Sequence, residues 1–109
     1  MPTPHHPAAG VRRALRKLGA DIQDARKRRR LPMSVLAERA FTSRTTLQRI
    51  EAGDAGVGIG IYAAVLQALG LLEELASVAD VSRDAIGQSL ASAELPTRAR
   101  LRRPVKPDA

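Results

Sequence analysis

The feature that most constrains the fold is the stretch Leu31–Gly53, which reads LPMSVLAERAFTSRTTLQRIEAG. Pro32 ends the helix before it, because the residue that precedes a proline avoids the helical region of backbone space. Apolar spacing then predicts a short helix over Met33–Ala40. Thr42 and Ser43 are favoured N-cap residues for a second helix, and the closing glycine is a natural stop after it. The stretch therefore predicts two short helices joined by a tight turn.

The second of these helices has one apolar and one polar face. Leu47 and Ile50 are three positions apart, so they share a side of the helix and are expected to be buried. The outer side carries Arg44, Thr45, Gln48 and Arg49. The major groove of DNA accepts one helix, on which arginine can pair with guanine, glutamine with adenine and a threonine methyl with that of thymine. We therefore predict that these four residues read bases; the alternative is an ordinary polar surface helix.

Charge is segregated along the chain, whose net charge is +7. Residues 1–31 carry nine Lys or Arg against two Asp, and residues 95–109 carry five against one. Residues 54–94 carry one Arg against six acids. Basic regions that flank an acidic one favour a polyanionic partner such as nucleic acid, and the alternative is a solvated basic surface. The only aromatic residues are Phe41 and Tyr62, too few to stack single strands, so duplex DNA is the better target.

Helical periodicity continues on both sides of this stretch, and no segment alternates as a strand would. A first helix is predicted by an apolar stripe made of Val11, Leu15, Leu18, Ile22 and Ala25. Gly19 weakens its middle, so its first two turns are expected to fray or to form a separate piece. Later helices are predicted over 59–69 and 71–79, and a weaker one, capped by Ser82, to about Leu95.

The elements predict an all-α fold, a compact bundle of five to six helices. The predicted organisation is a disordered N-terminal arm over 1–10, a helix-turn-helix domain over 11–79, a C-terminal helix over 80–95 and a basic flexible tail over 96–109. The arm and the tail are proline-rich and lack periodicity.

From Leu18 to Leu71 the chain resembles the XRE family of phage-repressor-like helix-turn-helix domains. The matching residues are Leu31, Leu36–Ala40, Ser43–Leu47, Arg49–Glu51 and Gly53. The resemblance implies a lambda-repressor-like DNA-binding domain and a repressor function. It also implies that Arg26 forms a structural ion pair with Glu51, which would hold the recognition helix against the first helix.

Three positions depart from the family pattern. Pro32 replaces the usual Ser cap, and Met33 replaces a Gln that often touches phosphate, although the backbone amide there can still face one. Phe41 stands where the turn usually has Gly. Since a phenylalanine with positive φ would be strained, a turn of slightly different shape is predicted.

Phosphate contacts are expected from residues around the recognition helix in the sequence. They should come from basic residues at the end of the first helix, from the two helix starts and from amides of the glycine-rich loop. The predicted residues are Lys27, Arg28, Arg30, Met33, Ser43, Gly56, Val57 and Gly58. Such contacts set affinity and its salt dependence, whereas base contacts set sequence preference.

The helices over 59–79 are apolar on nearly every face, which predicts burial on more than one side. A symmetric homodimer through Leu71, Leu72, Leu75 and Val78 would supply the second contact and would suit a palindromic operator. The alternative is that the C-terminal helix covers this surface within one subunit.

The order GDAGVGIGIYAAVLQALGL, an acidic apolar helix and LPTRARLRR is similar to HipB-like antitoxins. That resemblance implies an antitoxin that represses its own operon and inactivates a HipA-type Ser/Thr kinase toxin, with the tail as a candidate kinase contact. The alternative is a stand-alone XRE-family regulator of phage or host genes with no toxin partner.

Other function classes find little support in the sequence. There is no cysteine, and His5 and His6 lie adjacent in the predicted arm without a third ligand, so we expect no metal and no cofactor. We recognise no carboxylate pair and no phosphate-binding loop in the sequence, so we expect neither an enzyme nor a small-molecule substrate. No segment suggests a signal peptide or membrane span, so a cytoplasmic protein is expected. A general basic architectural protein is a further alternative, distinguished by sequence-independent binding.

Overall fold

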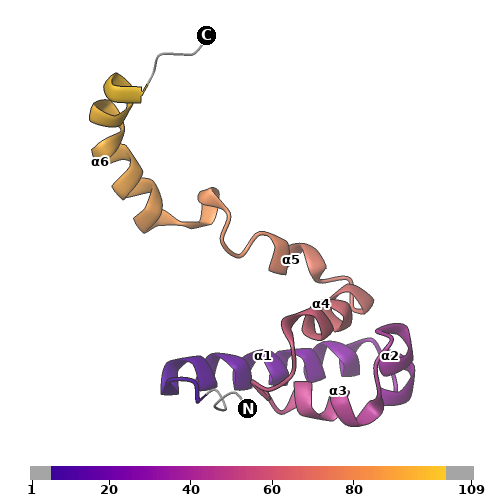
Figure 1. Cartoon of the computed structure of the whole chain (residues 1–109). Helices are drawn as coiled ribbons and strands as arrows, with labels where there is room; N and C mark the ends of the chain where they lie inside the picture. Colours follow the sequence, from indigo (N-terminus) through magenta and orange to yellow (C-terminus); the bar gives the residue numbers. More distant parts are fainter. Residues whose placement is uncertain (1–5, 103–109) are drawn as a thin grey trace. The chain divides into compact units, whose positions relative to one another are not determined.

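A computed structural model of the chain describes residues 6–102, and these residues form helices and no strand (Figure 1). The predicted all-α class is therefore confirmed. The chain divides into two units, residues 1–75 and 76–109. Unit 1 contains α1 (Ala9–Arg28), α2 (Met33–Arg39), α3 (Arg44–Glu51), α4 (Ile59–Ala68) and most of α5 (Leu72–Ala76). Unit 2 contains the 3-10 helix η1 (Val81–Arg83) and α6 (Ala85–Arg102).

One apolar core holds unit 1 together. α3 packs on α1 and α2, and α2 packs on α4. The largest fully buried side chains are Ile22, Leu36, Leu47, Ile50 and Val65. They come from α1, α2, α3 and α4, so the two helices of the motif are fixed by the same cluster that fixes their neighbours. The predicted burial of Leu47 and Ile50 is confirmed.

α1 is a single unbroken helix, and the expectation that Gly19 would fray its first turns was wrong. Gly19 is buried, and a Cβ placed there would lie 2.6 Å from the carbonyl oxygens of both Ile50 and Glu51. The glycine therefore lets the backbone of α1 approach the last turn of α3. Its cost in helix propensity is offset by this close packing of the two helices.

Four successive helices end in the same backbone motif. After the C-cap of α1, α2, α3 and α4, a residue with positive φ donates its N–H to a carbonyl three residues back, and the next residue donates five residues back. This is the Schellman arrangement. The positive-φ residues are Arg30, Phe41, Gly53 and Gly70, with φ of 56°, 56°, 79° and 80°. The predicted glycine stop of α3 is confirmed, and Gly70 ends α4 in the same way.

The turn between α2 and α3 keeps this arrangement although a phenylalanine occupies it. The Phe41 N–H donates to the Glu38 carbonyl at 3.0 Å, and the Thr42 N–H donates to the Ala37 carbonyl at 2.9 Å. The expectation of a differently shaped turn was wrong, because Phe41 itself adopts the left-handed conformation. Its side chain is 95% exposed, so no burial of the ring compensates this strain within the structure.

Unit 2 departs from the predicted boundaries. α5 ends at Ala76 instead of continuing to 79, and Ser82 lies within η1, where its N–H donates to the Asp80 side chain at 2.8 Å. Asp84 precedes α6 and accepts from the Gly87 N–H at 2.9 Å. α6 continues through Pro96 to Arg102, so the predicted end of the helix before this proline was wrong. The remainder of the predicted tail, 103–109, and residues 1–5, with His5, lie outside the described residues.

No helix within residues 6–102 combines the length and apolar character that crossing a membrane requires.

Candidate nucleic-acid interface

α3 presents a polar face on the surface of unit 1. Arg44, Thr45 and Gln48 are exposed, while Leu47 and Ile50 anchor the opposite face in the core. Ser43 is the N-cap: its Oγ accepts from the Thr46 N–H at 3.0 Å and donates to Thr46 Oγ1 at 3.0 Å. The structure thus places three of the four predicted base-reading residues together on open surface of one helix.

A buried ion pair fixes α3 against α1. Arg26 donates from Nε to Glu51 Oε2 at 2.7 Å and from Nη2 to Oε1 at 3.2 Å, the two-point geometry that arginine makes with a carboxylate. The two side chains are only 10% and 4% exposed. Arg26 Nη1 also donates to the Leu31 carbonyl at 3.1 Å, which ties α1 to the start of the motif. This is the ion pair that the family resemblance implied.

Arg49, the fourth predicted base reader, is exposed but has a partner within the chain. Its Nε donates to Asp54 Oδ2 at 2.8 Å. Asp54 also accepts from the Gly56 N–H through Oδ1 at 2.7 Å, and its carbonyl accepts from the Tyr62 hydroxyl at 2.8 Å. The hydrogen bond from Arg49, followed by that from Gly56, holds the pKa of the Asp54 carboxyl below its usual value.

The contact between Asp54 and Arg49 was not predicted from the sequence. The available signal was an acid five residues after an arginine, on the far side of a glycine that reverses the chain.

The predicted phosphate contacts lie at the end of α1, at the starts of α2 and α3, and in the loop before α4. Lys27 and Arg28 are exposed in the last turn of α1, and Arg30 is exposed just after it. They form a basic rim near the start of α2, where Met33 packs its side chain partly against the core. The Ser43 side chain caps α3 and is exposed, so it is accessible to a phosphate while it serves as the cap. Its phosphate contact stays a prediction.

The glycine-rich loop before α4 is less open than predicted. The Gly56 N–H already donates to Asp54, so a phosphate would compete with that carboxylate for the amide, and the phosphate contact of Gly56 stays a prediction. The Val57 side chain is buried in the core, and its N–H lies 3.5 Å from the Asp54 carbonyl. Gly58 is the exposed N-cap of α4, where no residue side chain supplies the cap. The phosphate contacts of Val57 and Gly58 stay predictions.

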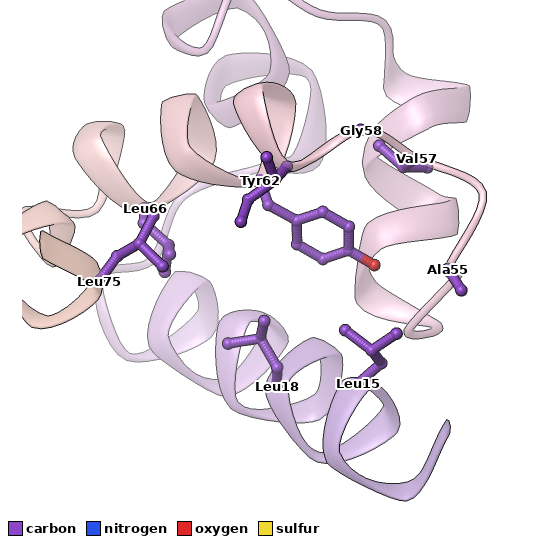
Figure 2. A pocket seen from close by; sticks show the side chains of 9 residues that line it. Leu15, Leu18, Ala55, Val57, Gly58, Tyr62, Leu66 and Leu75 are labelled. Carbon is purple, nitrogen blue, oxygen red and sulfur yellow. The ribbon is translucent and has the colours of Figure 1, made fainter. Parts of the chain in front are cut away.

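An apolar groove of about 350 Å³ lies on unit 1 (Figure 2). Its lining comes from α1, from the loop before α4, and from α4 and α5: Leu15, Leu18, Ala55, Val57, Gly58, Ile59, Tyr62, Leu66 and Leu75. Tyr62 is 5% exposed, and burial raises the pKa of its hydroxyl above the usual 10.0.

The four residues predicted for a dimer contact differ in exposure. Leu71 and Leu75 are half-buried and pack against the core of unit 1, and Leu72 is half-buried as well. Val78, in unit 2, is 68% exposed. These positions contain apolar surface, and the dimer contact stays a prediction.

The geometry defines a helix-turn-helix unit: two helices joined by a tight turn on one core, with the second helix turned outward. A family model described as a helix-turn-helix domain, of the XRE/Cro-like kind, matches residues 17–76. The chain therefore belongs to this family, and the match covers α2, α3, α4, α5 and most of α1. Comparison with curated proteins and with solved structures gave no match.

Proposed function

We propose that this chain is a transcriptional repressor that binds double-stranded DNA through α3 in the major groove. The observation that carries the proposal is the exposed face of α3, with Arg44, Thr45 and Gln48, on a helix pinned by the buried Arg26–Glu51 pair. A rigid scaffold with outward-facing Arg and Gln is what direct base reading requires. The role proposed is binding, without catalysis, a cofactor or a small-molecule substrate.

The proposed repressor acts as a homodimer on a palindromic operator in the cytoplasm. The support is apolar surface that unit 1 and unit 2 do not bury within themselves: Ile59 is 72% exposed and Val78 is 68% exposed. A two-fold dimer would place its two recognition helices in successive major grooves, about 34–36 Å apart along the duplex. Leu71, Leu72, Leu75 and Val78 remain the proposed contact.

The finer proposal is that the repressor is the antitoxin of a HipA-type kinase. It is supported by the similarity to HipB-like antitoxins in the loop before α4 and in the residues around 95–103, outside the recognition helix. A stand-alone regulator without a toxin is the alternative, and the gene beside this one distinguishes the two.

The test is footprinting of the protein on its own upstream region, with and without the product of the neighbouring gene. Protection of two inverted half-sites supports repression by a dimer. Protection that the kinase-like product strengthens or extends supports the antitoxin role. Unprotected upstream DNA, or uniform protection of unrelated duplexes, would contradict the repressor proposal.

A matched pair of variants separates the dimer from the helix-turn-helix itself. Val78→Asp places a charge in the proposed contact and should convert a dimer to a monomer in sedimentation, while unit 1 stays folded. Ser77→Asp is the control. It places the same charge on half-buried Ser77, next to Val78. Equal mass for the wild type and both variants would contradict a contact at Val78.

A further inference from the structure

The guanidinium of Arg49 is held by a hydrogen bond within the DNA-free protein, whereas a fully solvated arginine would have no such partner. The Nε–H donates to Asp54 Oδ2 at 2.8 Å, while the side chains of Arg49 and Asp54 remain 48% and 37% exposed. The bond occupies one of the five N–H groups of the guanidinium. The other four, on the two terminal nitrogens, are those that can make a bidentate contact to guanine.

Asp54 is itself fixed at three atoms besides the one that meets Arg49. Its N–H donates to the Arg49 carbonyl at 3.0 Å, its Oδ1 accepts from Gly56 at 2.7 Å, and its carbonyl accepts from Tyr62 at 2.8 Å. Gly53, with φ of +79°, turns the chain back so that these bonds form beside the last turn of α3. The carboxylate is therefore placed rigidly with respect to the recognition helix.

The loop also leaves room for the guanidinium. A Cβ on Gly56 would lie 3.2 Å from Arg49 Nη2 and 3.1 Å from Asp54 Oδ1. A side chain at position 56 would thus press on both members of the pair. Glycine at position 56 therefore leaves both members of the pair unobstructed on this side.

Stability does not explain this arrangement well. An exposed ion pair contributes little to folding, because water screens it and two long side chains lose freedom. A carboxylate beside a DNA-facing helix also repels phosphate and lowers affinity for any duplex. The benefit that remains is orientation, since an arginine already ordered loses less entropy when it binds.

We propose that Asp54 is a positioning residue that orients Arg49 toward one guanine of the operator and so raises specificity at a cost in general affinity. The proposal rests on base reading by α3. It assigns to a residue of the α3–α4 loop a role that is exerted through Arg49.

The test measures affinity for two duplexes, the selected operator and the same duplex with the contacted guanine replaced. The variant is Asp54→Asn, which keeps an oxygen for the Gly56 N–H but removes the charge that holds Arg49. Discrimination between the duplexes should fall about 2- to 10-fold, the range expected when one ordered side chain becomes free. Affinity for the guanine-substituted duplex should rise, because one negative charge is lost.

Two controls make the result specific. Asp24→Asn removes a charge from an exposed position of α1 and should leave discrimination unchanged. In the Arg49→Ala background, Asp54→Asn should no longer change discrimination, because the side chain that it orients is gone.

Three outcomes would overturn the proposal. Equal gains of affinity for both duplexes would make Asp54 a repulsive charge only. Equal losses, with a lower melting temperature, would make it a structural residue of the loop. In the third outcome, Asp54→Asn keeps full discrimination between the duplexes while Arg49→Ala loses it. That result would exclude orientation of Arg49 by Asp54 but would still support base reading by Arg49. If Arg49→Ala and Arg44→Ala both keep full discrimination, base reading by α3 is itself contradicted.

Discussion

Replacing Gly19 by alanine sets two known effects against each other. In an exposed helix the change stabilises by about 1 kcal/mol, because glycine loses more backbone freedom on folding. Here the new Cβ would lie 2.6 Å from the carbonyl oxygens of Ile50 and Glu51. Both are backbone atoms of the last turn of α3, so no rotamer change relieves the contact.

The magnitude follows from this geometry. Overpacking a well-packed site costs about 1–3 kcal/mol, and the upper part of that range applies when backbone must move. After the gain in helix propensity is subtracted, we expect Gly19→Ala to lower the free energy of unfolding by about 1–2 kcal/mol. For a domain of this size that lowers Tm by about 4–16 °C.

The assay is urea unfolding followed by circular dichroism, with Gly60→Ala as the matched control. Gly60 lies in α4, is exposed, and a Cβ there meets nothing within 4 Å. The control should therefore stabilise the protein by about 0.5–1 kcal/mol. If Gly19→Ala proves as stable as Gly60→Ala, α1 and α3 do not approach as closely as described.

Three further predictions concern stability. Phe41→Gly should raise the free energy of unfolding by about 0.5–1 kcal/mol, because relief of about 1–2 kcal/mol of left-handed strain exceeds the extra freedom of the unfolded glycine; a lower urea midpoint would mean that the exposed ring contributes to folding. Glu51→Ala should cost about 3–5 kcal/mol by leaving Arg26 buried without a partner, and an unchanged thermal midpoint would refute that. Burial raises the pKa of Tyr62, so its contribution to stability is fully present below the unfolded value of 10.0 and is lost as pH rises through the folded value. Urea midpoints between pH 9 and 11.5 should fall for the wild type and vary less for Tyr62→Phe, and parallel curves would contradict this.

Much of unit 1 was predictable because its determinants are local. Ser43 caps α3, Gly53 and Gly70 end α3 and α4, and the spacing of Leu47 and Ile50 defines the buried face. Each of these signals acts within one helix or one turn. The Arg26–Glu51 pair spans 25 residues, and only the family resemblance indicated it.

The errors arose where a distant contact or a neighbouring bond decides the outcome. Within α1 alone, Gly19 predicts a weakened helix. The structure shows that the backbone of α3 packs closely against it. Phe41 reads as incompatible with a glycine turn, yet the hydrogen bonds that close α2 impose the turn on it. The Asp54 carboxylate accepts from both Arg49 Nε and the Gly56 N–H, a local network that charge counting along the chain does not reveal. Pro96 favours the end of a helix, yet α6 continues through it to Arg102.

The central claim, that α3 reads duplex sequence, is tested most directly by selection of binding sites from random duplexes at physiological salt, followed by sequencing. We expect enrichment of two inverted half-sites whose centres lie about one helical turn apart. Gln48→Ala and Arg44→Ala should each lose preference at one position per half-site, by about 1–3 kcal/mol. Flat enrichment, with binding that salt weakens equally for every duplex, would contradict the central claim.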